Sequence, residues 1–426
     1  MIGRSFFGLI RPKLRVPPTP IRADVEEIPL PQEAHFLLKH SNIGFRDLLI
    51  KAGDRLRTGQ RLLLSEQSGE YLVSPVTGRV SVISEYKGYL GRVYPRISVQ
   101  VEAKDEWDDA FAMGGKRPGV ARALTFLAGL PGAGHLRSLF QGQTRIDTLI
   151  VNGLDRDLLV SANLWVAGTE AEALTEGIGF LREGIGAERV LVVLPPEVGA
   201  RVPVSGAEVR VLSPRYPESF PPLLTRKLLG RIVPPGRTCR DVGVGFVSAE
   251  EVVALAKALE TGSVPVEKVL TVIRKDHTTV NVRARVGTPV GDVLEHLKIE
   301  LRQGDRLVLG GPMTGEAIYS GDMPVLADTD ALMVQDREGI AYASDNQCIN
   351  CGECVRACPA RVPVNMLVRL LANGLYEEAA ERYDLLSCVE CGLCSYVCIA
   401  RIPVFQYIML GKHEFSRIES AEESNG

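Results

Sequence analysis

Two segments near the carboxyl end of the chain carry the same arrangement of four cysteines. Residues 348–358 and 388–398 both read C-x2-C-x2-C-x3-C, and both continue into Ala-Arg-x-Pro-Val. Three thiolates at this spacing can surround one four-iron cubane, while the fourth cysteine ligates the other cluster in proteins that hold two. The repeat therefore predicts a domain built from two copies of one unit, which holds two 4Fe–4S clusters and moves electrons.

Because the fourth cysteine of each copy ligates the cluster of the other copy, the ligands of each cluster can be assigned. One cluster is predicted on Cys348, Cys351, Cys354 and Cys398, and the other on Cys388, Cys391, Cys394 and Cys358. Gly352 and Gly392 follow the second cysteine of each copy, where glycine lets the backbone turn tightly around the cluster. Structural zinc is the alternative for paired C-x2-C units, but a tetrahedral site has no use for the third cysteine at this spacing.

The remaining cysteine and the histidines predict no further metal site. Cys239 stands alone and is interpreted as a buried apolar residue or an inert thiol. None of the six histidines has metal-ligand spacing with another. Because eight of the nine cysteines fall in two tight clusters, a disulfide scaffold is not expected. The expected compartment is therefore reducing and cytoplasmic.

The bulk composition is that of an ordinary soluble protein. The 426 residues are enough for about three domains, and 45% are hydrophobic and 24% charged. A net charge of −3 gives no electrostatic reason to expect nucleic acid. No apolar run approaches the roughly 18–20 residues that cross a bilayer, so no transmembrane segment is expected. Residues 1–17, where a short apolar patch lies between basic residues, are interpreted as a docking tail.

The amino-terminal part of the chain is rich in strand and turn signals. Residues 18–104 read as short strands separated by turns, with two β-rich runs around Thr77 and Gly78. This pattern resembles the barrel-sandwich hybrid of lipoyl and biotinyl carrier domains. The carrier lysine is absent because Thr77 and Gly78 occupy the tip, so a structural or docking role is predicted.

The middle of the chain alternates strand-like and helix-like stretches. In residues 118–262, strand patterns such as 148–152 alternate with amphipathic runs such as 171–185, which favours βαβ units and a mostly parallel sheet. Residues 263–335 turn β-rich again around a helical stretch at 290–297. They indicate a small β-grasp unit.

The cysteine domain is predicted over residues 340–412. Between its two copies, residues 364–373 have apolar residues at helical spacing, Gly374 is a plausible terminator, and a second helix follows to about residue 386. This helical insert distinguishes the domain from a compact bacterial ferredoxin. The acidic residues 413–426 are expected to form a flexible tail. The predicted fold class is therefore multidomain, combining α/β and α+β units with an α-helical two-cluster ferredoxin domain.

The order of these units resembles the C subunit of Rnf-type ion-translocating electron-transport complexes. The resemblance covers about residues 18–412, and its most specific matches are residues 74–80, 146–152, 310–315 and 402–407. In that family the α/β and β-grasp (SLBB-like) units resemble the flavoprotein subunit of respiratory complex I, bind FMN and take hydride from NADH. The resemblance implies membrane and soluble partner subunits and a peripheral place on the inner face of the cell membrane.

The first departure from the family lies in its flavin loop. The family has Gly-Gly-Ala-Gly-Phe-Pro-Thr followed by a lysine, where small residues let the backbone approach the FMN phosphate. Residues 127–139 keep Gly132 and Gly134 but lose Phe-Pro-Thr and the lysine, which leaves Arg137 as a candidate cation.

Two further departures affect the same surface. Asp155 and Asp157 stand where the family has Glu-x-Glu-Pro, with Arg156 between them. The family has a glycine pair after Tyr-Pro, whereas residues 216–222 read Tyr-Pro-Glu-Ser-Phe-Pro-Pro, whose bulk and prolines would obstruct a nucleotide. FMN binding and NADH dehydrogenase activity are therefore not expected, and Gly132, Gly134, Asp155 and Asp157 are interpreted as a scaffold that has lost its ligand.

The leading hypothesis is a peripheral iron–sulfur subunit of a membrane-bound Rnf-like redox complex. It would relay electrons between a protein donor and a protein acceptor, with no catalytic residue of its own. One alternative is an FMN-containing, NADH-oxidising subunit that feeds a Rnf-type ion pump. Another is a soluble flavin-linked reductase such as the cobalamin reductases, whose domain order differs. A third is a non-redox assembly scaffold with structural clusters.

Overall fold

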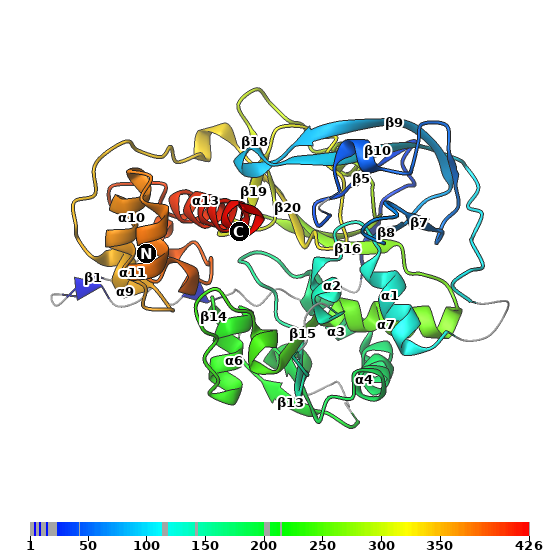
Figure 1. Cartoon of the computed structure of the whole chain (residues 1–426), viewed down its shortest axis with the longest axis horizontal. Coiled ribbons are helices and arrows are strands. Elements are labelled where there is room, and N and C mark those ends of the chain that lie inside the picture. Colours follow the sequence, from blue (N-terminus) through cyan, green and yellow to red (C-terminus); the bar gives the residue numbers. More distant parts are fainter. Residues whose placement is uncertain are drawn as a thin grey trace.

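The chain folds into a mixed α/β structure with three larger β-sheets and a helical carboxyl end (Figure 1). The computed structural model describes residues 24–41, 43–112, 118–140, 144–199, 205–213 and 215–425, together with the backbone of β1 (Arg4–Ser5), β2 (Gly8–Leu9) and β3 (Leu14–Arg15). The predicted docking tail, residues 1–17, lies outside the described residues apart from these three strands.

An antiparallel sheet forms the first unit. Its strands, in order across the sheet, are β5 (Glu33–Leu37), β10 (Val93–Val101), β9 (Gly78–Lys87) and β6 (Arg55–Leu56), and β7 (Arg61–Leu63) pairs separately with β8 (Tyr71–Val73). Alternate residues of the strands face inward, so that Val80, Ile97 and Val99 pack in one core with Phe36 and Leu72. The strand-rich character predicted here is confirmed.

Thr77 and Gly78, which the sequence places at the tip of a turn, are covered by other parts of the chain. Thr77 is fully buried, and its Oγ1 accepts hydrogen bonds from the N–H groups of Thr58 (3.1 Å) and Glu106 (2.9 Å). Gly78 begins β9, where an added Cβ would collide with the carbonyl of Gln100. The turn is covered by segments that are distant in sequence, which a local pattern does not reveal.

A four-stranded parallel sheet is the centre of the second unit, as predicted. Its strand order is β13 (Glu208–Val211), β12 (Arg189–Leu194), β11 (Thr148–Asn152) and β15 (Val244–Ser248). One face packs against α1 (Val120–Ala128), α2 (Gly134–Phe140), α3 (Ala162–Thr169), α4 (Ala171–Ile185) and α7 (Ala249–Thr261). The other face packs against α6 (Pro221–Leu229) and Cys239, whose thiol pKa is raised by burial.

A six-stranded sheet forms the third unit. Its order is β19 (Glu316–Ile318), β18 (Arg306–Leu309), β20 (Ala331–Gln335), β16 (Glu267–Ile273), β17 (Thr279–Arg285) and β4 (Glu26–Glu27), with α8 (Val290–His296) packed on it. The edge strand β4 departs from the predicted division, because the sequence pattern places residues 26–27 in the first unit. They pair in parallel with Val282 and Arg283 instead, since the edge of β17 offers unpaired backbone groups.

Helices surround the cysteine segments at the carboxyl end. They are α9 (Glu353–Ala357), α10 (Val364–Ala372), α11 (Tyr376–Arg382), α12 (Leu393–Tyr396) and α13 (Val404–Asn425). The predicted helical insert, α10 and α11 on either side of Gly374, is confirmed. The flexible tail predicted over residues 413–426 is wrong, because α13 continues through residue 425. Its buried Ile408 anchors the helix, and Glu414 pairs with Arg417 at 3.0 Å one turn later.

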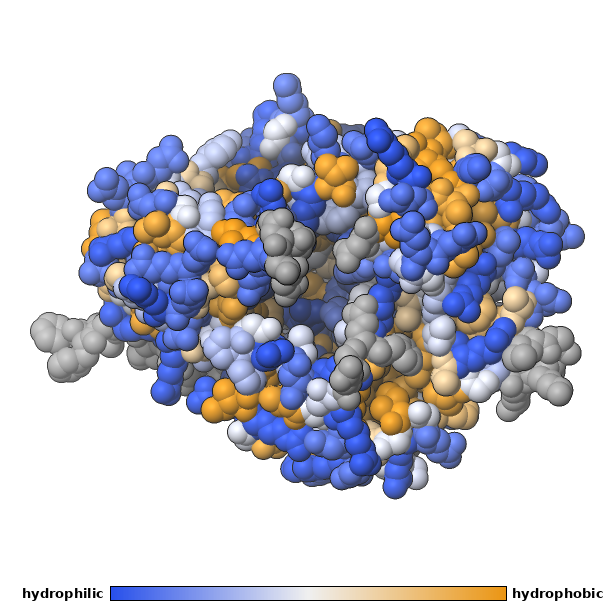
Figure 2. Space-filling view, in the orientation of Figure 1, coloured by the Kyte–Doolittle hydropathy of each residue, from blue (hydrophilic) through white to orange (hydrophobic). Residues whose placement is uncertain are grey.

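One face of the molecule is largely hydrophilic, with smaller hydrophobic areas and a hollow near its middle (Figure 2). None of the helices in the described ranges combines the length and the apolar character needed to cross a membrane.

Candidate iron–sulfur centre

The two cysteine segments adopt the same backbone conformation. Three pairs of equivalent residues have left-handed angles: Asn350 (φ 56°) and Glu390 (φ 58°), Gly352 (φ 74°) and Gly392 (φ 69°), and Arg361 (φ 61°) and Arg401 (φ 55°). Each fourth cysteine also donates its N–H three residues back, Cys358 to Val355 at 3.3 Å and Cys398 to Ser395 at 3.2 Å. The repeat in the sequence is therefore a repeat of structure, with the predicted tight turn after each second cysteine.

The eight predicted ligands gather at one end of the molecule. Six of them belong to one apolar cluster: Cys348, Cys354, Cys358, Cys388, Cys394 and Cys398. Cys391 packs in an adjoining cluster, and Cys351 is exposed. Among the described residues, no three His, Cys, Asp or Glu side chains converge on one ion position. Cubane clusters are held by cysteine thiolates spaced around their own iron and sulfide atoms, so this donor set fits them.

The pKa values of two thiols are raised by burial and by other cysteines. Burial raises the pKa of the Cys354 thiol to about 11, and Cys348 and Cys351 add to that shift. Burial raises the pKa of Cys391 to about 12, with Cys388 and Cys358 adding to it. The fourth cysteine of the first copy thus adds to the pKa shift of a thiol in the second copy.

Around its second cysteine the second copy is covered by the rest of the chain, whereas the first copy is exposed there. Cys391 is buried in one cluster with Tyr216 and Phe220 of the α/β unit, and the Tyr216 hydroxyl donates to the Cys391 carbonyl. In the first copy the equivalent Cys351 is exposed, and Ile349 beside it is 64% exposed. The two copies therefore differ in their surroundings rather than in their own conformation.

The glycines that follow the second cysteines, Gly352 and Gly392, also differ in their surroundings. A Cβ added to Gly392 would collide with the carbonyl of Met313, in the loop between β18 and β19. A Cβ added to Gly352 would meet only the end of the Arg356 side chain, at 3.3 Å. Gly392 therefore permits a close approach between two units, while Gly352 meets only its own copy.

Asp157 holds the Met313 loop in place. Its carboxylate accepts hydrogen bonds from the N–H of Met313 (3.1 Å), the N–H of Thr314 (2.8 Å) and the Thr314 hydroxyl (2.7 Å). Burial raises the pKa of this carboxyl, and the bond from Thr314 opposes the shift. Sequence reasoning missed this positioning role, although the distinctive Gly-Gly-Pro-Met-Thr-Gly run at residues 310–315 was the available signal.

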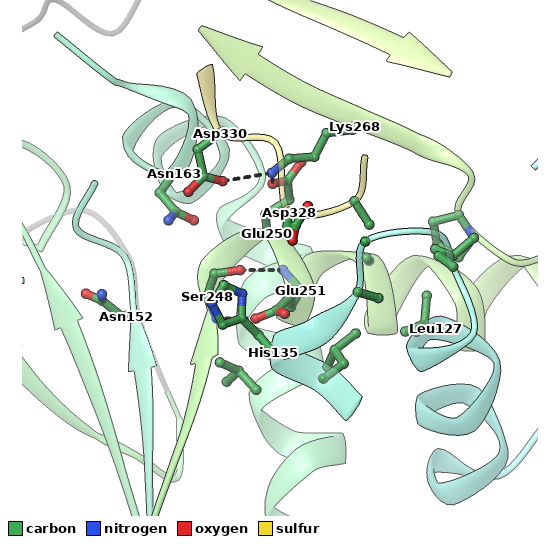
Figure 3. A pocket seen from close by; sticks show the side chains of 18 of the residues that line it. Leu127, His135, Asn152, Asn163, Ser248, Glu250, Glu251, Lys268, Asp328 and Asp330 are labelled. Atoms are coloured by element: carbon green, nitrogen blue, oxygen red, sulfur yellow. Dashed lines mark hydrogen bonds and ion pairs between the residues drawn. The ribbon is translucent and has the colours of Figure 1, made fainter. Parts of the chain in front are cut away.

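A cavity of about 110 Å³ lies at the carboxyl ends of β11 and β15, where open α/β sheets commonly bind ligands. Its charged lining is mainly acidic, with Glu250, Glu251, Glu267, Asp328 and Asp330 against Arg156 and Lys268. Figure 3 shows Lys268 between Glu250 and Asp330, and it pairs with Asp330 at 3.2 Å and also with Glu250. The lysine thus neutralises protein carboxylates at this site.

Gly132 and Arg137 lie in the stretch compared with the family's flavin loop, and both are engaged by other parts of the chain. An added Cβ on Gly132 (φ 91°) would strike the side chain of Leu326. Arg137, the candidate cation, donates instead to the carbonyls of His40 (3.4 Å) and Ala128 (3.2 Å). It does not line the cavity.

Asp155 also serves the fold. It accepts hydrogen bonds from the N–H groups of Asn163 (2.9 Å) and Leu164 (3.2 Å) at the start of α3. Burial raises the pKa of its carboxyl to about 7.

Comparison with known proteins agrees with this centre. A family model described as a 4Fe–4S dicluster domain matches residues 340–399, which include both cysteine segments. The C subunit of the proton-translocating ferredoxin:NAD(+) oxidoreductase complex of Clostridium ljungdahlii is 27% identical over 92% of this chain and 90% of that protein. This chain resembles the C subunits of ion-translocating oxidoreductase complexes. The resemblance stated from the sequence is thereby confirmed.

Other relatives of this kind are longer. The C subunit of the ion-translocating oxidoreductase complex of Serratia proteamaculans is 28% identical over 88% of this chain and 56% of that protein. The Pectobacterium carotovorum protein of the same name is 27% identical over 80% of this chain and 48% of that protein. The chain thus spans about half the length of these two relatives.

Among solved structures, a chain of an NAD+-reducing NiFe-hydrogenase in the H2-reduced state matches with a TM-score of 0.44 and 16% identity, over 72% of this chain and 62% of that one. That likeness is too distant to carry an argument.

Proposed function

We propose that the chain is a peripheral iron–sulfur subunit of a Rnf-like redox complex and relays electrons between protein partners. The observation that carries the proposal is the duplicated cysteine unit, one copy packed against the chain's other units and the other exposed. Two neighbouring one-electron centres with different exposure suit a relay. The similarity to named complex subunits supports partner subunits, and we place the chain in the cytoplasm, on the inner face of the cell membrane, as part of the same proposal.

The crossed ligand assignment is part of this proposal. One 4Fe–4S cluster takes Cys348, Cys351, Cys354 and Cys398, and the other takes Cys388, Cys391, Cys394 and Cys358. Cys358 and Cys388 both raise the pKa of the Cys391 thiol, which supports the second set. When bound, the clusters supply one-electron chemistry, and the chain supplies thiolates, burial and the approach of partners.

The remaining units are proposed to serve as a scaffold. We assign residues 18–104 to a barrel-sandwich hybrid, 118–262 to a flavoprotein-like α/β domain, 263–335 to an SLBB-like β-grasp domain and 340–412 to the ferredoxin-like domain. Each of the three larger sheets has a core drawn mainly from its own unit, which supports this division. Strand β4 of the first unit pairs with the sheet of the third.

We further propose that the chain binds no FMN and does not oxidise NADH. A cavity of about 110 Å³ is well below the roughly 300–1,000 Å³ of sites for nucleotide-sized ligands. Its acidic lining repels a phosphate, and Lys268 is already paired with Glu250 and Asp330. The alternative, an FMN-dependent NADH-oxidising subunit, would require both the loop around Gly132 and this ion-pair network to rearrange.

Anaerobic purification tests the proposal. We expect two 4Fe–4S clusters by iron content and electron paramagnetic resonance (EPR), no extractable flavin, and no bleaching of the cluster absorbance by NADH. Stoichiometric FMN with rapid reduction by NADH would contradict it and support the alternative.

A non-redox scaffold with structural clusters is tested by replacing one ligand at a time. In Cys354→Ala and Cys394→Ala variants, a relay predicts loss of electron transfer in complexes that still assemble. Full electron transfer in assembled complexes that lack one cluster would support the scaffold.

A further inference from the structure

Lys412 joins the long carboxyl-terminal helix to the second cysteine copy. It lies in α13, and its ammonium group donates hydrogen bonds to the carbonyl of Cys388 (2.7 Å) and to the carboxylate of Glu390 (2.6 Å). The lysine side chain is 19% exposed, whereas that of Glu390 is 40% exposed. A positive charge that is largely shielded from solvent is therefore held against the backbone of a predicted cluster ligand.

The first copy cannot form this ion pair at the equivalent positions. Equivalent residues of the two copies lie 40 positions apart in the sequence. By this spacing, Ala372 stands in place of Lys412, and Asn350 stands in place of Glu390. The ion pair therefore belongs to the second copy and marks a point at which the two copies have diverged.

The backbone at one of these positions favours asparagine over glutamate. Asn350 and Glu390 both have left-handed angles, φ 56° and φ 58°. Among residues with a side chain, asparagine and aspartate adopt this conformation most readily. Glutamate is thus the less favourable choice for the turn, and its bond to Lys412 offsets that cost. The preference indicates that Glu390 is present for its charge and not for its backbone conformation.

We propose that Lys412 and Glu390 set the reduction potential of the second cluster through their opposite charges, with Lys412 as a positioning residue that acts through the Cys388 carbonyl. The inference rests on the proposed relay function. Reduction transfers one electron from the relay's protein donor to the cluster, which becomes one charge more negative, and no bond forms or breaks.

The two charges act in opposite directions on that reduction. A nearby cation stabilises the reduced form and a nearby anion destabilises it, and solvent weakens the effect of an exposed charge. Because Lys412 is the more buried partner, its charge dominates. The pair therefore raises the potential of the second cluster above the value it would have without the pair.

A purely structural role is the competing explanation, in which the pair only fastens α13 to the turn after Cys388. Removal of either partner would then lower stability, and neither change would shift the potential in a direction set by charge. An effect of charge predicts opposite shifts when the cation and the anion are removed. The signs of the two shifts therefore distinguish the two roles.

The test is a redox titration of the anaerobic, full-length chain with its clusters, followed by EPR and driven by dithionite with mediators. The signal of the second cluster is the one lost in Cys391→Ala. We expect Lys412→Met to lower the equilibrium constant for its reduction about tenfold, which is about 59 mV for one electron. Glu390→Gln should raise that constant about threefold, because solvent screens the more exposed charge. Lys412→Arg keeps the charge and should keep the wild-type potential.

Arg356→Met is the matched control. In the first copy, Arg356 donates to the carbonyl of Cys351 at 2.9 Å and pairs with Glu353. The substitution thus removes a cation that contacts a ligand's backbone in the other copy. It should leave the potential of the second cluster unchanged.

Two outcomes overturn the proposal: an unchanged potential of the second cluster in Lys412→Met, and shifts of the same sign in Lys412→Met and Glu390→Gln. If Lys412→Met does not retain the second cluster, Glu390→Gln decides, since an unchanged or lower potential contradicts the proposal. Clusters that form in the wild-type chain leave the relay function standing whatever the shifts. A wild-type chain without clusters would refute the relay itself.

Discussion

The two cysteine copies share a backbone but not an environment. In the second copy, Cys391 is buried against Tyr216 and the Met313 loop approaches Gly392, whereas Cys351 of the first copy is exposed. The local pattern therefore specifies how a cluster is wrapped, and the neighbouring units specify which cluster meets solvent. The proposed relay would use that asymmetry, with the first cluster reachable from solvent and the second packed against the body of the protein.

The largest expected effect comes from removing equivalent ligands. Cys391→Ala and Cys351→Ala should each lose about half of the iron, because each removes a ligand of one cluster. Cys391→Ala should also lose about 3 kcal/mol or more of stability, because its cluster is part of a buried contact between units and cluster binding is coupled to folding. Cys351→Ala should lose about 1 kcal/mol. Iron analysis with anaerobic thermal unfolding measures both, and equal losses of stability would refute the asymmetry.

Alanine substitutions at Gly352 and Gly392 should distinguish the cost of backbone strain from the cost of a steric collision. Gly352→Ala has the left-handed strain alone, about 1 kcal/mol. Gly392→Ala has the same strain and also collides with the Met313 carbonyl, which should add about 1–3 kcal/mol. Urea unfolding of the two variants provides the comparison. If both lose the same stability, the Met313 loop is not fixed against the second copy.

A smaller loss of stability is expected from substituting Asp157, which holds the Met313 loop. Asp157→Asn keeps the shape but cannot accept all three hydrogen bonds from Met313 and Thr314, so we expect a loss of about 1–2 kcal/mol. Solvent should also reach the second cluster more readily, which faster loss of its iron to a chelator would reveal. Unchanged iron loss would mean that the loop does not shield the cluster.

Asp155→Asn is the matched control for that variant. The folded pKa of Asp155 is raised from 3.8 to about 7, so the folded state binds more protons than the unfolded state between these values. Stability from this group is therefore complete below pH 3.8 and falls as the pH rises through about 7. The amide should remove that fall without changing iron loss from either cluster.

Sequence reasoning was strongest where the structure depends on neighbours along the chain. The cysteine spacing and the glycines at 352 and 392 specified the turns of both copies, and apolar spacing specified α4 and α10. It failed where a distant segment decides the outcome. Thr77 is buried and accepts hydrogen bonds from the N–H groups of Thr58 and Glu106. Strand β4 completes a sheet whose other strands begin more than two hundred residues later.

At the candidate site, too, local features could be predicted and contacts between distant segments could not. All eight cysteines could be named from their spacing, but nothing local predicts that Tyr216 reaches Cys391 or that Asp157 braces the Met313 loop. Phe220, in the run whose bulk departs from the family pattern, packs in one cluster with Tyr216 and Cys391. A residue interpreted as a change at one site thus contributes to the packing of another.

Whether the two clusters differ in their access to solvent can be measured by EPR of the reduced, full-length chain in the presence of a soluble paramagnetic lanthanide chelate. We predict two 4Fe–4S signals, with the signal lost in Cys351→Ala strongly broadened by the chelate and the signal lost in Cys391→Ala nearly unaffected. A single cluster, or equal broadening of both signals, would contradict the proposed asymmetric relay.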